Sequence, residues 1–160
     1  MPVKAARRLL AGVWDGKTNL NLPIDPRVMA KKEGVRVIAD PALNDDSISG
    51  EFNFENGVPV IRYNPHDSVK RQRFTIAHEL GHFALNHGHA FRDNKKNFSL
   101  QNFDLQEVAA NKFAAELLMP EIAVRILVNK RKITDIEELA RLFDVSVIAI
   151  KYRLEKLGFL

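Results

Sequence analysis

The sequence contains no cysteine, and this absence removes one class of stabilising and metal-binding chemistry. Without thiols the chain forms no disulfide, so any metal ion has to be held by His, Asp or Glu side chains. The lack of disulfides fits a reducing cytoplasm. The sequence also has no apolar run long enough to span a bilayer or to form the core of a signal peptide. We therefore expect a soluble, cytoplasmic protein that does not enter a membrane.

Internal repeats and low-complexity segments are also absent, so the 160 residues are expected to form one compact domain with one core. Within it, residues 1–24 are predicted as an N-terminal helix and linker, residues 25–130 as the core, and residues 131–160 as a helical end. The 24 Lys and Arg residues outnumber the 20 Asp and Glu residues by only four. A solvated basic surface explains this small excess better than a dedicated nucleic-acid-binding face does.

The pattern of turn signals and apolar residues predicts an α+β fold, in which a three-stranded sheet is followed by a helical body. Strands are expected over residues 35–39, 48–54 and 58–63, with a hairpin turn at Glu55-Asn56-Gly57. The polar stretch 87–102 has no clear period and is expected to be a mobile loop over one face. Helices are predicted over residues 3–11, 25–34, 68–86, 105–119, 120–128, 135–143 and 147–157.

The segment His78-Glu79-Leu80-Gly81-His82 carries the strongest chemical signal. Histidines four residues apart lie one turn apart on the same helical face, so their imidazoles can converge on one ion. Glu79 lies between them in rotation and can contact a metal-bound water without being a ligand. This arrangement is typical of metal-dependent hydrolysis. The alternative, a pair of surface histidines, fits poorly because residues 76–85 are apolar nearly all round.

The third metal ligand is expected from a downstream acidic side chain, and Glu107 is the best placed. Its competing interpretation is a capping box at the start of a helix, because Asp104 precedes it by three residues. Small residues on the helical face of Glu107 would let this helix approach the histidine helix closely. That face contains Glu107, Ala110, Asn111, Ala114 and Leu118.

Three further residues have side chains that could bind a metal ion, but their positions in the sequence favour other roles. His87 is half a turn out of phase with His78, and His89 misses the spacing of an extended histidine motif. Both are interpreted as helix-end or loop histidines that could still reach a substrate. Glu116 lies off the face of Glu107 and one turn after Lys112, which favours a surface ion pair.

Two stretches of the sequence resemble the ImmA/IrrE family of bacterial and phage metallopeptidases. They are residues 71–82, RQRFTIAHELGH, and residues 107–120, EVAANKFAAELLMP, and the strand 58–64 before them also fits. The likeness covers roughly residues 25–160. It implies a small gluzincin-like zincin core with Zn²⁺ held by His78, His82 and Glu107 and with Glu79 as general base. Mn²⁺ or another divalent ion is an alternative, because such ligands accept several metals.

The resemblance also implies a regulatory role. Members of the family act on helix-turn-helix repressors, often encoded nearby, and cleavage or sequestration releases transcription of stress, mobile-element or phage genes. The chain is therefore expected to be a zinc metallo-endopeptidase whose substrate is such a repressor. The alternative is a non-proteolytic protein, similar to a toxin–antitoxin partner, that binds a regulator or DNA and whose zinc site is structural. An intact Glu79 favours the enzyme, because a structural site has no use for a general base.

Several residues are candidates for contact with the substrate. Tyr63, His66 and Arg71 are candidates for stabilising the oxyanion, although each could equally be structural. Asn111 is expected to steady Glu107 or the backbone of the histidine helix. The strand over residues 58–63 is expected to pair with an extended substrate by strand addition.

The C-terminal end resembles a helix-turn-helix, with Asp144 where a glycine is usual. Asp tolerates a left-handed turn conformation, so this departure is acceptable. Lys151, Arg153 and Lys156 are candidates for contact with DNA. The favoured interpretation is a packing helix or a repressor-docking surface, because Val147, Ile150, Leu154 and Leu157 form an apolar helical face. Direct DNA binding is the weaker alternative.

Overall fold

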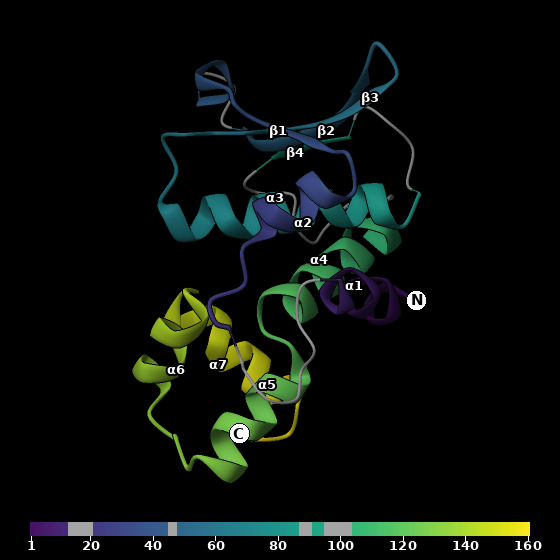
Figure 1. The fold of residues 1–160 in the computed structure, drawn as a ribbon. Coiled ribbons are helices and arrows are strands. Elements are labelled where there is room, and N and C mark those ends of the chain that lie inside the picture. The colour runs from purple at the N-terminus through teal and green to yellow at the C-terminus, as the bar shows by residue number, and fades with distance from the viewer. Residues whose placement is uncertain (13–20, 45–47, 87–90, 95–103) are drawn as a thin grey trace.

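A computed structural model describes residues 1–12, 21–44, 48–86, 91–94 and 104–160, and its architecture is α+β, as predicted (Figure 1). The three expected strands are present within one or two residues of the predicted bounds, and so are the expected helices except the one over residues 120–128, which ends as an α-helix at Arg125 and continues as a π-helical turn. The elements are α1 (Pro2–Ala11), α2 (Pro26–Lys32), β1 (Arg36–Ala39), a 3-10 turn (Pro41–Asn44), β2 (Ile48–Glu55), β3 (Val58–Tyr63), α3 (Val69–Ala84), β4 (Phe91–Asn94), α4 (Asp104–Leu118), α5 (Glu121–Arg125), a π-helical turn (Ile126–Lys130), α6 (Ile136–Phe143) and α7 (Val147–Lys156).

The sheet has the strand order β1-β3-β2-β4, with β1 parallel to β3 and the other neighbours antiparallel. β2 and β3 form the predicted hairpin, in which Phe52 pairs with Ile61. Its two turn residues, Asn56 and Gly57, have φ angles of 53° and 79°. Positive φ at both positions is typical of the tight hairpin turns that match the twist of the flanking strands.

The fourth strand, β4, differs from the expectation of a loop over residues 87–102. It pairs with β2, and Phe91 lies opposite Phe52 in the register. Its sequence, Phe-Arg-Asp-Asn, has no alternation of apolar and polar residues, so only the exposed edge of β2 reveals that a strand belongs here. The rest of the predicted loop lies outside the described residues.

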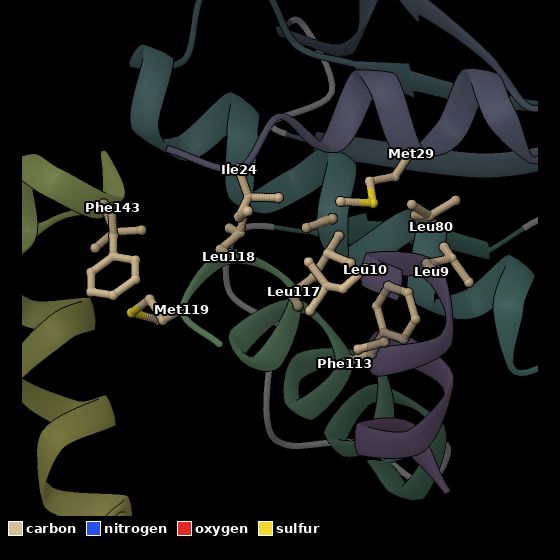
Figure 2. Close-up of a cluster of buried hydrophobic side chains, with 14 of the residues drawn as sticks. Leu9, Leu10, Ile24, Met29, Leu80, Phe113, Leu117, Leu118, Met119 and Phe143 are labelled. Carbon is tan, nitrogen blue, oxygen red and sulfur yellow. The ribbon is translucent and has the colours of Figure 1, made fainter. Parts of the chain in front are cut away.

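The elements form layers, with the sheet at one end of the molecule (Figure 1). α3 runs beneath the sheet, α4 and α1 pack below α3, and α5, α6 and α7 gather at the far end. Apolar side chains from α1, α2, α3 and α4 meet in one cluster between these layers (Figure 2). No helix in the described parts of the chain is both long and apolar enough to cross a membrane.

The last two helices form the expected helix-turn-helix-like unit. Asp144 adopts the left-handed conformation after α6, with φ of 54° and ψ of 52°. Ser146 caps α7 by accepting a hydrogen bond from the backbone N–H of Ala149 at 3.1 Å. The turn therefore tolerates Asp where glycine is usual, as expected.

The prediction that Glu116 forms a surface pair with Lys112 is wrong. The Glu116 side chain is only 3% exposed and lies 2.6 Å from the guanidinium of Arg153 on α7 and 3.2 Å from that of Arg7 on α1. Arg153 also donates a hydrogen bond to the Met119 carbonyl at 3.0 Å. Arg153 is thus a packing residue that joins α7 to α4, and it is not available for contact with DNA.

The Arg153–Glu116 pair is expected to contribute far more to stability than the Arg7–Glu116 pair. Replacing Arg153 by Met leaves a buried carboxylate with one half-exposed partner, and breaking a buried pair costs roughly 3–5 kcal/mol. Arg7 is 49% exposed, so Arg7→Met should cost at most about 1 kcal/mol. Urea unfolding of the two matched variants measures this difference. Equal losses would show that the Arg153 pair is no stronger than a surface one.

Candidate metal centre

α3 is buried along its second half, from Thr75 to His82, although this stretch contains four polar side chains. Ser68 caps the helix by accepting a hydrogen bond from the backbone N–H of Arg71 at 3.2 Å. His78, Glu79 and His82 are each 0% exposed. Buried polar groups need partners, so this helix depends on the elements that pack around it.

α4 supplies Glu107, which lies between the two histidines. Its carboxylate oxygens are 3.1 Å from His78 Nε2 and 3.0 Å from His82 Nε2, and Glu107 is itself 0% exposed. The imidazole rings are 4.8 Å apart and nearly perpendicular, at 88°. A metal ion bonded at about 2.0–2.2 Å to N and O ligands holds neighbouring ligand atoms roughly 3.3 Å apart. The separations from Glu107 are close to this value, so the three residues form a cluster that could hold a metal ion.

Asn111 orients the first of these imidazoles. His78 Nδ1 lies 2.8 Å from Asn111 Oδ1, which can only accept a hydrogen bond, so Nδ1 carries a proton. In neutral His78 the lone pair is then on Nε2 and faces the Glu107 carboxylate. Two lone pairs at this distance repel each other unless His78 is protonated or a cation lies close to both. The donor set therefore fits a metal ion. Asn111 contacts the imidazole, whereas the sequence predicted a contact with Glu107 or the helix backbone.

The close approach of α3 and α4 depends on a glycine and an alanine. A Cβ added to Gly81 would lie 3.2 Å from Ala110 Cα and 3.1 Å from Phe113 Cδ1. A Cβ at position 81 would thus require Ala110 or Phe113 to move by a few tenths of an ångström, so glycine permits the close approach of α4 that brings Glu107 to the histidines. The alanine at position 110 agrees with the expected small-residue face of α4.

Glu79 points from the same helix toward the sheet. A Cβ placed on Gly50 of β2 would be 3.3 Å from Glu79 Oε2, so the carboxylate lies directly against the strand. Glu79 is not a member of the metal-binding cluster. Its position next to His78 in sequence and its contact with β2 leave it beside the cluster, as the spacing predicted.

The three candidate oxyanion groups lie at different distances from the cluster. Tyr63 is opposite Gly50 in the sheet, and the Arg27 guanidinium covers its ring at 4.8 Å. His66 is exposed in the turn before α3, where its backbone N–H donates to Asn64 Oδ1 at 2.9 Å. Arg71 is exposed in the first turn of α3, about 10 Å along the helix axis from His78. Of the three, Tyr63 is the one that pairs with Gly50, the residue of β2 that lies against Glu79. His87 and His89 lie outside the described residues.

Arg73 is an anchoring residue that the sequence did not single out. It donates hydrogen bonds to the carbonyls of Ile24, Phe143 and Asp144 at 2.7, 3.3 and 3.1 Å. Burial lowers the pKa of its guanidinium from the usual value, and the Asp144 carboxylate opposes that shift. Arg71, two residues earlier, faces the other way. Two arginines in the polar first half of α3 were the available signal, but only the fold shows which of them is shielded from solvent.

The number of residues in the cluster bears on its use. Within the described parts of the chain it has three members. Structural zinc sites are almost always closed by four protein ligands, whereas catalytic sites keep a position for water. A three-membered cluster beside a buried carboxylate is the arrangement that hydrolysis requires.

The comparisons with known proteins agree with this geometry. The structure is similar to a Mycobacterium tuberculosis transcriptional regulator, with a TM-score of 0.60 and 18% sequence identity. That likeness covers 96% of this chain but 46% of the other, so this chain spans less than half the length of that protein. A search of curated proteins finds no significant match. The profile of the Peptidase_M78 family, described as the IrrE N-terminal-like domain, matches residues 30–155. The chain belongs to this family of metallopeptidase-like domains.

Proposed function

We propose that the protein is a cytoplasmic, zinc-dependent endopeptidase that cleaves a helix-turn-helix repressor and so derepresses stress, mobile-element or phage genes. The observation that carries the enzymatic part is the three-membered, fully buried cluster of His78, His82 and Glu107 beside Glu79. Membership of a peptidase family supports the same reaction class. The repressor substrate rests on the family resemblance and on the helix-turn-helix-like unit of α6 and α7.

The residues divide the work of peptide hydrolysis between them. His78, His82 and Glu107 bind the ion, and Asn111 keeps the His78 lone pair on Nε2 by accepting the Nδ1 proton. Bound zinc supplies a Lewis acid that polarises the scissile carbonyl and acidifies the attacking water. The Glu79 carboxylate accepts the proton lost by that water and later returns it to the leaving amine. Mn²⁺ or another divalent ion is the alternative metal.

The expected pairing of substrate with the strand over residues 58–63 is wrong. β3 is an interior strand, because β1 and β2 occupy both of its edges. Among the described strands, the edges of the sheet are those of β1 and β4. β4 is the edge nearer to Glu79, since it pairs with β2 at Gly50. If the substrate binds by strand addition, the β4 edge is where we propose that it adds.

One observation favours the second candidate function, a non-proteolytic protein that binds a regulator or DNA. Ile148 and Tyr152 of α7 are 79% and 63% exposed, and Lys151 and Lys156 are exposed on the same helix. This surface is available to a partner. Because Arg153 is buried, the basic side chains that α7 offers to DNA are fewer than the sequence predicted, and a protein partner is favoured over DNA.

The first prediction concerns metal binding. Glu107→Ala removes the only carboxylate of the cluster and should leave purified protein with little zinc. Metal content per chain, measured by elemental mass spectrometry, tests this. Glu155→Ala, the same change at an exposed position of a different helix, serves as the matched control and should keep wild-type zinc. Full zinc occupancy in Glu107→Ala would remove Glu107 from the ligand set.

The second prediction concerns the partner of His78. Asn111→Ala should lower zinc affinity about 10–100-fold, because hydrogen-bond partners of metal ligands typically contribute that much. Competition with a chelator of known affinity measures the change. Lys112→Ala, at the neighbouring exposed position, should have no effect. Equal affinities for both variants would mean that Asn111 does not orient the ligand.

The third prediction tests the reaction itself. Zinc-loaded protein is mixed with the helix-turn-helix regulator encoded nearest to it, and intact masses are followed over time. Wild type should produce two fragments, and Glu79→Gln should be about 10²–10⁴-fold slower while retaining zinc. Cleavage by Glu79→Gln at the wild-type rate would exclude Glu79 as the base. An uncut regulator held in a stable complex by both forms would support the non-proteolytic function.

A further inference from the structure

The face of β2 that packs on α3 runs along that helix, so that successive inward positions of the strand lie over successive turns of the helix. Phe52 packs on Phe83 of α3 with ring centroids 6.0 Å apart. Gly50 is two residues earlier on the same face of the strand, a step of about 6.6 Å. Glu79 is one helical turn before Phe83, a step of about 6 Å. The two steps match, so the packing of Phe52 on Phe83 sets position 50 of the strand over Glu79.

Position 50 has no room for a side chain. A Cβ there would overlap Thr75 Cγ2 and lie 3.3 Å from both Glu79 Oε2 and the Arg62 carbonyl oxygen. Thr75 is one turn before Glu79 and 1% exposed, so it is held in place. Gly50 is not among the residues with positive φ, so its backbone conformation is open to other residues. What requires glycine is the close approach of the strand backbone to Thr75 and Glu79.

The pairing of β2 is irregular at the same point. The register with β4 shifts between Ile48 and Gly50, which makes Ser49 the extra residue of a β-bulge. The buried hydroxyls of Ser49 and Thr75 have no hydrogen-bond partner among the described residues. Bulges are frequent beside active sites, where they redirect side chains.

We propose that Gly50 is a positioning residue for Glu79. Without a side chain at this point, the β2 backbone closes over the carboxylate, and Thr75 closes the side toward the start of α3. A glutamate has three rotatable side-chain bonds, and a general base has to hold one direction for proton transfer. The β2 backbone and the Thr75 side chain restrict the rotation of the Glu79 side chain. This role rests on the proposed peptidase function of Glu79.

The test separates packing from positioning by relieving the overlap at Thr75. Thr75→Ser keeps the hydroxyl and removes Cγ2, so Gly50→Ala/Thr75→Ser leaves only the ordinary tight contact of the new Cβ with Glu79 and the Arg62 carbonyl. The single variant Gly50→Ala should lose both thermal stability and turnover. Thr75→Ser is the reference for the double variant, which should have the same melting temperature and the same zinc content as Thr75→Ser. The kcat of the double variant should nevertheless stay about 10-fold lower with little change in KM, because the new Cβ at 3.3 Å makes the Glu79 carboxylate give way by a few tenths of an ångström, less than the ~1 Å that costs about 100-fold.

Gly12→Ala is the matched control, because a Cβ at that position meets only the Leu9 carbonyl oxygen, at 3.5 Å. A double variant with the kcat of Thr75→Ser would reduce Gly50 to a packing residue and overturn the proposal. If the wild type cleaves no regulator, the proposed peptidase function fails, whatever the role of Gly50. Crystal structures of Thr75→Ser and of the double variant then test whether Gly50 fixes the position of the Glu79 carboxylate. A Glu79 carboxylate displaced by a few tenths of an ångström in the double variant supports positioning, and an unmoved carboxylate contradicts it.

Discussion

The burial of polar side chains within one helix is the constraint on which the rest of this structure depends. α3 buries the side chains of His78, Glu79 and His82, each of which is 0% exposed. Each buried polar group without a partner costs about 1–3 kcal/mol, so the neighbouring elements have to supply partners. α4 supplies Glu107 and Asn111, and the sheet covers Glu79. The positions of α4 and β2 relative to α3 follow from this requirement as much as from apolar packing.

Local patterns predicted the parts of the site that lie within one element. His78 and His82 follow from helical spacing, and Glu107 follows from the periodicity of one face of α4. The errors concern residues whose partners come from distant segments. Glu116 looked like a surface residue because Lys112 is nearby in sequence, but its partners are on α1 and α7. β4 was missed because its four residues carry no strand signal of their own, and pairing with β2 decides their conformation.

One arginine links the helix-turn-helix-like unit to the helix that carries the histidines. Arg73 donates to the carbonyl of Asp144 at the turn between α6 and α7, and it is five residues before His78. The α6–α7 unit is therefore attached by direct hydrogen bonds to α3, the helix that also carries His78 and His82. A regulator docked on the exposed side of α7 would lie on an element joined to α3. This arrangement is compatible with both candidate functions, and the chemistry of Glu79 distinguishes them.

On each of two sides of α3, a glycine allows a neighbouring element to approach closely. On one side Gly81 lets α4 approach until Glu107 reaches both histidines, and on the other Gly50 lets β2 approach until its backbone meets the Glu79 carboxylate. A Cβ at either position would lie closer to its neighbours than ordinary van der Waals contact, so atoms of the packed element would have to move. The proposed ligand set and the proposed general base thus depend on separate close contacts. Disturbing the α4 contact should weaken metal binding, whereas disturbing the β2 contact should spare the metal and misplace the base. That difference makes the two halves of the site separable by substitution, even though His78 and Glu79 are adjacent in the sequence.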